Sequence, residues 1–443
     1  MSNKRLTAVI LASSLLLAGC DTLSGMFPDE DKKPLPGERV SILELQRDLS
    51  PDPALQNQGV TLPEAWTNQF WPQAGGYSNH AMGNLTLGAD LKEAWQESIG
   101  VGGSERSPLI ASPIVAEGMV FTLDTEGDVT GFDAKTGSKK WEQSIIPRGE
   151  TDSGALGGGL AYASGKLFVS NGYKQLVALN ATDGARAWKV DTISPVRSAP
   201  SVADDRVYVT TLDNKLLVYS AADGSPLWNF SGVDETTNLL GSASVAVDSS
   251  IVVLPLSSGE LYGLRAENGQ IVWEDNLASV RRSGTLSSIS DIRGLPVIDQ
   301  NVVFAASYSS RLVAIDPVSG QRIWQREVGS AETTLSAGDH VYTISSDQQL
   351  AALTRSTGAV HWILSLPRFA DKDHKQPIVW TGPVMAGGRL IAASSNGSLV
   401  EVDPNVGKII HQREVGNPVT IAPVVADNTL YILTSNGRLI AYR

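Results

Sequence analysis

A repeated segment constrains this fold more than any other feature of the sequence. Each of seven repeats contains a ten-residue stretch with glycine at its sixth position, and in six of them a tryptophan follows four residues later. The glycines are Gly137, Gly184, Gly224, Gly269, Gly320, Gly358 and Gly407. The tryptophans are Trp141, Trp188, Trp228, Trp273, Trp324 and Trp362, and His411 takes the seventh place. The glycines recur every 38 to 51 residues, a period typical of propeller blades.

The residues between these stretches predict short β-strands. Runs such as Arg206–Thr210 alternate and are rich in β-branched side chains, which favours strands. Thr-Gly, Asp-Gly, Asn-Gly and Ser-Gly pairs place a glycine where a tight turn needs a positive φ. No helical stretch of ten or more residues separates the strands, so each repeat reads as a blade of four short strands. The tryptophans are interpreted as core packing, because the same residue in every blade cannot be one active site.

The two ends of the repeat region complete each other. The last repeat, 421–443, supplies only three strands, and the missing fourth strand ends at Trp95 near the other end. Pairing these two segments closes the ring and removes exposed sheet edges. The sequence therefore predicts an all-β fold over residues 64–443. This is an eight-bladed β-propeller with four antiparallel strands per blade, closed by pairing of the N- and C-terminal strands.

The first residues have the pattern of a secretory signal. Two basic residues precede the apolar run 6–17, which is too short to span a bilayer. The run ends in Leu-Ala-Gly before Cys20, the single cysteine of the chain. This resembles a bacterial lipoprotein signal, which implies removal of residues 1–19 and lipid on the Cys20 thiol. Two or more lipid chains give a stable membrane anchor.

A tether is predicted between this anchor and the propeller. Residues 20–63 are rich in proline and include the charged run 29–33, a composition that favours an extended chain. An aspartate directly after the lipidated cysteine retains some lipoproteins in the inner membrane. Asp21 therefore leaves inner-membrane retention open beside the expected place at the periplasmic face of the outer membrane.

Composition and spacing exclude several functions. The net charge of −12 argues against nucleic-acid binding, because no basic field exists to displace counterions from phosphates. With one cysteine the chain has no cysteine-based metal site, and the histidines show no zinc-protease spacing. We therefore expect no catalytic residues, no metal, no cofactor and no small-molecule substrate.

The repeat resembles the propellers of the pyrroloquinoline-quinone superfamily, and within it the BamB-like outer-membrane assembly lipoproteins. The segment Trp71–Gly76 also resembles the start of the propeller in that superfamily. Quinone dehydrogenases carry adjacent cysteines and a calcium-binding cluster, and this chain has no cysteine after residue 20. The resemblance therefore implies a non-enzymatic scaffold of the outer-membrane barrel-assembly machinery. A quinoprotein dehydrogenase-like protein and a propeller that binds envelope polysaccharide remain the alternatives.

The resemblance also implies where partners bind. In the BamB-like lipoproteins, two interblade loops contact the periplasmic domains of the large barrel subunit. The matching residues of the first loop are Ile193, Val196 and Arg197, which precede Ser-Ala-Pro. In the second loop Asp291 matches one of two aspartates, and Arg293 stands where the other is expected. The expected partners are this BamA-like subunit and unfolded outer-membrane proteins.

Overall fold

The computed structural model describes residues 49–56, 58–147, 149–150, 157–233, 243–278 and 291–443. All of them belong to one compact unit, Leu49–Arg443. The signal segment, Cys20 and most of the tether lie outside the described residues. The only helical element among the described residues is the 3-10 turn η1 (Pro53–Leu55).

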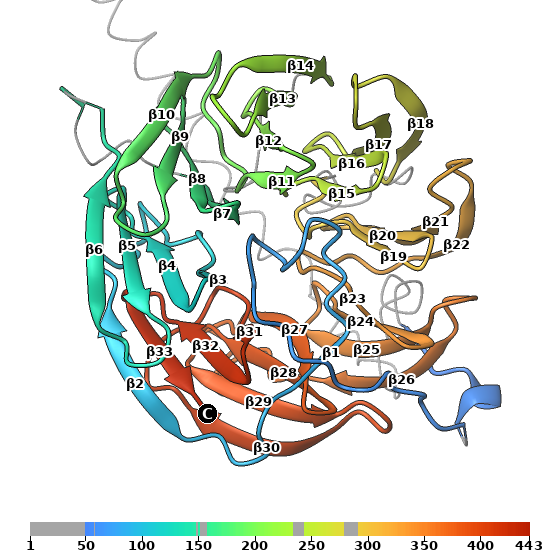
Figure 1. Cartoon of the computed structure of the whole chain (residues 1–443). Helices are drawn as coiled ribbons and strands as arrows, with labels where there is room; N and C mark the ends of the chain where they lie inside the picture. The colour runs from blue at the N-terminus through green and yellow to red at the C-terminus, as the bar shows by residue number, and fades with distance from the viewer. Residues whose placement is uncertain (1–48, 57, 148, 151–156, 234–242, 279–290) are drawn as a thin grey trace, which may run out of the picture. The chain divides into compact units, whose positions relative to one another are not determined.

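The described strands form eight sheets arranged around a common centre, as the sequence predicts (Figure 1). Six sheets consist of four consecutive strands each. Their strands are β3 (Ile114–Ala116), β4 (Met119–Leu123), β5 (Asp128–Asp133), β6 (Lys139–Ser144); β7 (Gly158–Ala163), β8 (Lys166–Asn171), β9 (Gln175–Asn180), β10 (Arg186–Asp191); β11 (Ser201–Ala203), β12 (Arg206–Thr210), β13 (Lys215–Ser220), β14 (Pro226–Ser231); β15 (Ala246–Asp248), β16 (Ile251–Pro255), β17 (Glu260–Arg265), β18 (Ile271–Asn276); β19 (Val297–Asp299), β20 (Val302–Ala306), β21 (Leu312–Ile315), β22 (Arg322–Arg326); and β23 (Leu335–Ala337), β24 (His340–Ile344), β25 (Gln349–Thr354), β26 (Val360–Ser365).

The two remaining sheets include strands from the N-terminal side of the propeller. The seventh contains β27 (Trp380–Ala386), β28 (Arg389–Ser394), β29 (Ser398–Asp403) and β30 (Lys408–Glu414), and β1 (Asn84–Leu85) pairs in parallel with β27. The eighth contains β31 (Val424–Ala426), β32 (Thr429–Leu433) and β33 (Arg438–Tyr442), and β2 (Glu93–Ser98) pairs antiparallel with β33. The predicted ring closure is confirmed. Strand β1 is an addition that the repeat pattern does not contain.

Burial follows the position of each strand in its blade. The first strands of the blades lie around the centre and are mostly buried, and β3 and β31 are wholly buried. The last strands, such as β6 and β14, lie at the rim and are mostly exposed (Figure 1). The apolar core lies between adjacent blades, where for example Val218 of β13 clusters with Leu254 of β16. The molecule is therefore held together by packing from blade to blade.

The repeated glycine and tryptophan form this blade-to-blade contact. The tryptophan of one blade lies on the glycine of the next, so that a Cβ on Gly224 would come within 2.9 Å of Trp188. The same tryptophans donate their indole N–H to a backbone carbonyl of the next blade, as Trp273 does to Pro317 O at 2.7 Å. Each repeated glycine also has a positive φ, between 64° and 76°, which costs side-chain-bearing residues more than glycine. The tryptophans therefore pack between adjacent blades.

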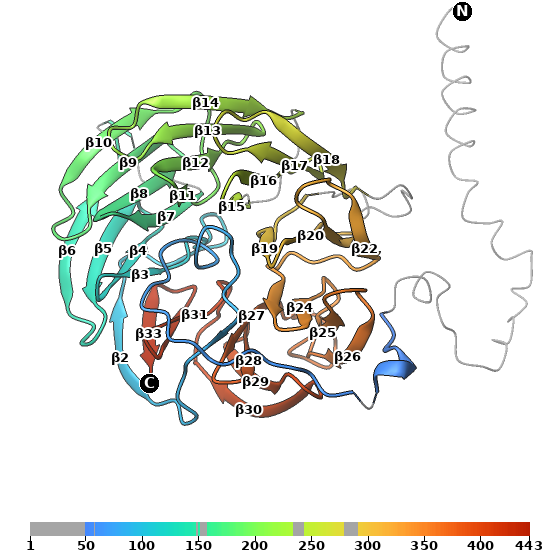
Figure 2. The same ribbon diagram turned by 45° about the vertical axis from the view of Figure 1, so that its right-hand side comes forward.

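A segment before the first complete blade crosses the centre of the ring, and we call residues 66–87 the strap (Figures 1 and 2). The strap is hydrogen-bonded to the first strand, or the turn after it, in seven of the eight described blades. The contacts are Asn68 with Val425 and Asp427, Trp71 with Val115, Pro72 with Tyr162, Gln73 with Val202, Ser78 with Val247, Asn79 with Ile298, and β1 with β27. The eighth blade is contacted just before the strap, where Val60 and Leu62 pack beside Leu335.

The end of the predicted tether also contacts the propeller. Leu49 packs in the apolar cluster that contains Val360 of β26. The backbone N–H of Asp52 donates to Val360 O at 2.8 Å. As a result β26 is the last strand of its blade yet begins with three buried residues, whereas its counterpart β6 is mostly exposed.

Candidate docking site at the interblade loops

The loop between β10 and β11 carries three of the predicted docking residues, and its backbone is held between two blades. Gly158 N donates to Arg197 O at 3.2 Å from the preceding blade. Thr210 N donates to Ser198 Oγ at 2.9 Å within the following blade. These bonds fix the path of the loop at the start of β11.

The three predicted residues of this loop differ in their exposure. Ile193 is 65% exposed, Arg197 is half-buried, and Val196 is fully buried. Val196 forms a β-bridge with Thr211 and packs in an apolar cluster with Val207. Ile193 and Arg197 therefore present side chains at the surface, while Val196 anchors the loop from below.

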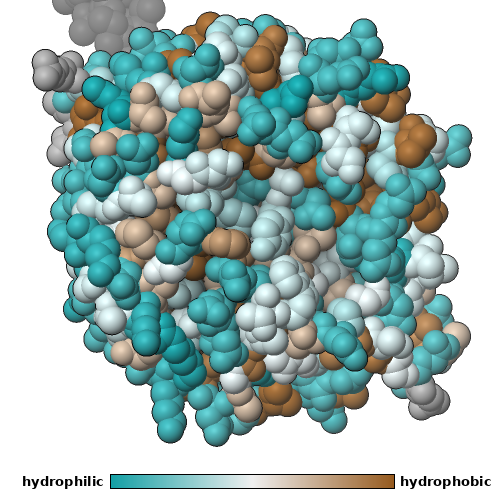
Figure 3. Space-filling view, viewed as in Figure 1, coloured by the Kyte–Doolittle hydropathy of each residue, from teal (hydrophilic) through white to brown (hydrophobic). Residues whose placement is uncertain are grey.

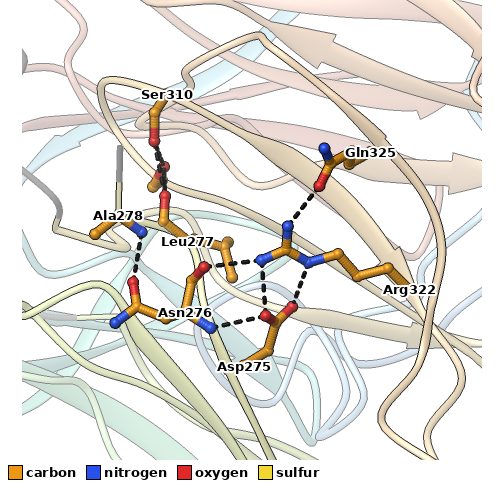
Figure 4. A network of polar contacts seen from close by, with 8 residues as sticks. Asp275, Asn276, Leu277, Ala278, Ser310, Arg322 and Gln325 are labelled. Carbon is orange, nitrogen blue, oxygen red and sulfur yellow. Dashed lines mark hydrogen bonds and ion pairs between the residues drawn. The ribbon is translucent and has the colours of Figure 1, made fainter. Parts of the chain in front are cut away.

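The loop between β18 and β19 carries the other two predicted residues, and its first end is held by a polar network (Figure 4). Arg322 donates to both carboxylate oxygens of Asp275 at 2.7 Å and to Asn276 O at 2.8 Å. Ser310 donates to Leu277 O at 2.7 Å. Because Arg322 and Ser310 belong to the next blade, the network ties the beginning of the loop across the blade boundary. Residues 279–290 lie outside the described part.

The second end of this loop is held by hydrogen bonds that involve its backbone. Tyr308 N donates to Asp291 O at 2.9 Å, and Asp291 is only 5% exposed. Arg293, two residues later, is exposed. Leu295 N donates to Thr333 Oγ1 at 3.2 Å, which ties the loop to the following blade. Of the two predicted residues, Arg293 thus presents its side chain to solvent and Asp291 lies within the fold.

The two loops meet at a cavity in the middle of the ring. A cavity of about 160 Å³ is lined by residues that lie before or at the start of five first strands (β3, β7, β11, β15 and β19), and by Ala74 of the strap. Arg197 and Arg293 both line it, although 95 residues separate them in the sequence. Since the lining residues precede their strands, the cavity lies on the side of the ring that carries the interblade loops.

One buried carboxyl group, that of Glu332, interacts electrostatically with Arg293. Glu332 accepts hydrogen bonds from Thr381 Oγ1 at 2.8 Å and from Gly382 N at 3.0 Å. Burial raises the pKa of the Glu332 carboxyl, while these hydrogen bonds and the charge of Arg293 lower it. Arg197 and Arg293 thus bring two guanidinium groups to this cavity, in a chain whose net charge is −12.

Sequence reasoning did not find Glu332 or the role of the strap. Glu332 lies in an ordinary interblade loop, and nothing near it in the sequence marks it. The sequence pattern of Trp71–Gly76 indicates only the start of a propeller. Its hydrogen bonds to distant blades have no local sequence signal.

Two observations concern side chains elsewhere that could bind a metal ion or carry out catalysis. Within the described ranges, no three His, Cys, Asp or Glu side chains lie close enough to hold a metal ion. Asp339, His340 and His361 form a hydrogen-bonded chain inside one blade, at 2.5 Å and 2.9 Å. This chain of hydrogen bonds ends at His361, which is next to the packing residue Trp362 on β26.

The opposite side of the ring carries two larger hollows and a mixed surface. Hollows of about 470 and 480 Å³ lie among the turns that join strands within blades, and Asp204 lines both. The face in Figure 3 is largely hydrophilic, with apolar side chains scattered over it. In the part of the chain that the structure describes, no helix has the length and apolar character needed to cross a membrane.

The fold and the site together define a class of protein, an eight-bladed β-propeller with a pocket lined by its interblade loops. Comparison with known proteins gives the family. The model of the family described as "Outer membrane protein assembly factor BamB" matches residues 87–150, 126–364 and 369–443. The chain belongs to this family.

Individual relatives agree with the assignment. Outer membrane protein assembly factor BamB of Yersinia pestis is 26% identical over 399 residues, which cover 89% of this chain and 92% of the relative. The crystal structure of BamB from Moraxella catarrhalis has a TM-score of 0.67 at 21% identity, covering 80% of this chain and all of that one. Quinohemoprotein alcohol dehydrogenase from Comamonas testosteroni has a TM-score of 0.65 at 14% identity and covers 85% and 81%. The structural matches show a shared fold, and the family match identifies an assembly factor and not a dehydrogenase.

Proposed function

We propose that this assembly factor docks on the large barrel subunit of the outer-membrane assembly machinery through the loop side of the ring. The observation that carries the proposal is the convergence of Arg197 and Arg293 on one cavity from two separate loops. In the same loop as Arg197, Ile193 is exposed and supplies apolar contact area. An arginine next to an exposed aliphatic side chain is typical of the anchor of an interface.

The charge of the site defines the partner surface that it fits. Guanidinium groups pair with carboxylates in a bidentate geometry that ammonium groups do not match. The partner surface in this proposal therefore presents acidic side chains to the cavity lined by the two arginines. Val196 and Asp291 contribute by holding their loops, because both are buried.

The rim supplies a second part of the proposal, which concerns unfolded outer-membrane proteins. Several last strands carry exposed aliphatic side chains, such as Ile271 on β18 and Ile410 on β30. An edge strand with exposed apolar residues accepts an additional strand by β-augmentation. Strand β26 serves as an internal control, because the chain at Leu49 and Asp52 already contacts it. Cross-linking groups placed near β18 are expected to label bound barrel chains, and groups placed near β26 are not.

The site of action follows from the N-terminal signal. We propose that Cys20 carries the lipid and that the chain acts at the periplasmic face of the outer membrane. Asp21 leaves the inner membrane as the competing location. Separation of the two membranes by density, followed by immunoblotting of the wild-type chain and an Asp21→Ser variant, distinguishes the two.

Docking is tested by measuring binding of the purified full chain to the purified periplasmic domains of the barrel subunit. Arg197→Ala is expected to weaken binding by about tenfold or more, with a smaller loss at high salt because screening already weakens the ion pair. Arg186→Ala is the matched control, because Arg186 is an exposed arginine on the rim strand β10. Equal affinities for the wild type and Arg197→Ala would contradict the proposed docking face. In a separate activity assay, reduction of an acceptor dye with alcohol and added quinone would favour the dehydrogenase alternative.

A further inference from the structure

The strap reaches the ends of both docking loops with two buried side chains. Gln73 Oε1 accepts a hydrogen bond from Val202 N at 2.7 Å, two residues after Pro200 closes the first loop. His80 Nδ1 donates to Pro296 O at 2.7 Å, where the second loop ends. Gln73 and His80 are 2% and 4% exposed, so neither bond competes with bulk water.

The chain between Gln73 and His80 is compact. Gln73 and Gly76 exchange two backbone hydrogen bonds at 2.9 and 3.2 Å, and His80 N donates to Tyr77 O at 2.9 Å. Gly75 leaves no room for a side chain, because a Cβ there would come within 2.6 Å of Leu295 in the second loop. The turn is therefore pressed against the loop that carries Arg293.

The same turn forms the floor of the cavity between the loops. Ala74 lines the cavity together with Arg197 and Arg293. One short segment thus contacts the end of the first loop, the floor of the cavity and the end of the second loop. Ser78 O accepts from Val247 N in a blade between the two loops, and Asn79 O accepts from Ile298 N in the blade that follows the second loop.

We infer that residues 73–80 are a positioning element that fixes the spacing of Arg197 and Arg293 across the cavity that both arginines line. This inference rests on the proposed docking function of the two arginines. A partner that must meet both guanidinium groups at once binds more tightly when their separation is set before binding, because less ordering is lost on association. Gln73 and His80 act through the arginines and do not themselves touch the partner.

The test uses the full chain and the periplasmic domains of the barrel subunit. Gln73→Met keeps a side chain of similar length and removes the acceptor of Val202 N, and it is expected to raise the dissociation constant about tenfold. Asn68→Leu is the matched control, because Asn68 fixes the strap to Val425 on another blade and lies outside residues 73–80. It is expected to lower the melting temperature while leaving affinity within twofold of the wild type.

A double-mutant cycle separates positioning from general stability. When Arg197 is already removed, adding Gln73→Met is expected to change the dissociation constant by less than threefold, because the substitution acts through that arginine. Independent, additive losses would overturn the inference. Hydrogen exchange at 193–203 supplies a readout without the partner, and faster exchange there is expected in Gln73→Met and not in Asn68→Leu.

The outcomes also distinguish this inference from the proposed function. If Arg197→Ala leaves binding unchanged, the proposed docking face is wrong and the inference falls with it. If Arg197→Ala weakens binding and Gln73→Met does not, docking stands and positioning is wrong. His80→Asn provides the second variant, since asparagine tolerates the positive φ of 59° at this residue, and the same weakening is expected from the other loop.

Discussion

At the scale of single residues, the contact between tryptophan and glycine explains the sequence pattern. Trp273 is 6% exposed, donates to Pro317 O and lies on Gly320, where a Cβ would come within 2.3 Å. The glycine is required twice, once by its φ of 71° and once by this close approach. A residue pair that repeats for this reason defines packing and carries no information about a binding partner.

Removal of one such tryptophan should be costly. Trp273→Ala is expected to lower the free energy of unfolding by about 3–5 kcal/mol, because it leaves a cavity between two blades and an unpaired carbonyl. Urea unfolding followed by circular dichroism measures the change. Ile271→Ala on the same strand is the control, since Ile271 is 54% exposed and its loss should cost about 0.5 kcal/mol or less. Similar losses for the two variants would contradict the packing role.

A second residue-scale prediction concerns His80 and pH. Burial lowers the pKa of His80 to about 4, from 6.5, while its bond to Pro296 O raises it. Because the folded value lies below the unfolded one, this contribution to stability is complete above pH 6.5 and is lost as the pH falls toward 4. The loss between pH 6.5 and 5 should be about 2 kcal/mol.

The pH effect is isolated by substitution. His340 has a pKa lowered chiefly by burial, so it contributes in the same direction and the wild type alone does not identify His80. Chemical denaturation of the wild type and His80→Asn at pH 7 and pH 5 is therefore compared. We expect the stability of His80→Asn to fall less between the two pH values, and parallel losses would show that His80 does not carry the effect.

At the scale of elements, the interblade loops are attached by their ends. The Asp275–Arg322 pair and the bonds to Asn276 and Leu277 hold the beginning of the second loop to the next blade (Figure 4). The pair is partly buried, with 15% and 25% of the two side chains exposed. A pair in this position stabilises the loop end more than a pair on the open surface does.

Arg322→Ala should release this end of the loop. The expected loss of global stability is about 1–2 kcal/mol, and amide exchange at Asn276 and Ala278 should accelerate beyond that global change. Both amides donate to side chains in the network, at 2.7 and 2.8 Å. Arg326→Ala is the control, because Arg326 bonds to carbonyls of residues 357 and 358 in another part of the ring. Unchanged local exchange in Arg322→Ala would contradict the anchoring role.

At the scale of the whole molecule, the ring is closed by hydrogen bonds and not by the chain. Lys92 N donates to Arg443 O at 2.7 Å, and Arg443 N donates to Lys92 O at 2.9 Å. The eighth blade therefore has no turn between its third and fourth strands. In the other blades, the repeated tryptophan packs on the glycine of this turn in the next blade. The seventh blade carries His411 in place of that tryptophan, and the eighth blade after it lacks the turn. The exception in the repeat therefore coincides with the seam of the ring.

Loss of β33 should open the ring. Truncation after Gly437 removes Leu439, Ile440 and Tyr442, which are buried, and leaves β2 and β32 with unpaired edges. We expect loss of the cooperative unfolding transition and aggregation, measured by circular dichroism and size-exclusion chromatography. Deletion of Arg443 alone removes bonds to Ala134 and Lys135 of the first complete blade and should lower the melting temperature while the chain stays monomeric. A cooperative, monomeric product of the longer truncation would show that closure is dispensable.

The amino-acid sequence by itself determined the blade, the number of blades and the seam. These depend on short-range rules, namely strand alternation, turn glycines and a tryptophan four residues after each glycine, so they can be read from local pattern. Only the tertiary structure decided that Val196 and Asp291 are buried beneath their loops, that Arg197 and Arg293 share one cavity, and that Gln73 and His80 lie under both loops. These relations join residues from different blades, and their distances are set by how eight sheets pack around a centre, which no local pattern encodes.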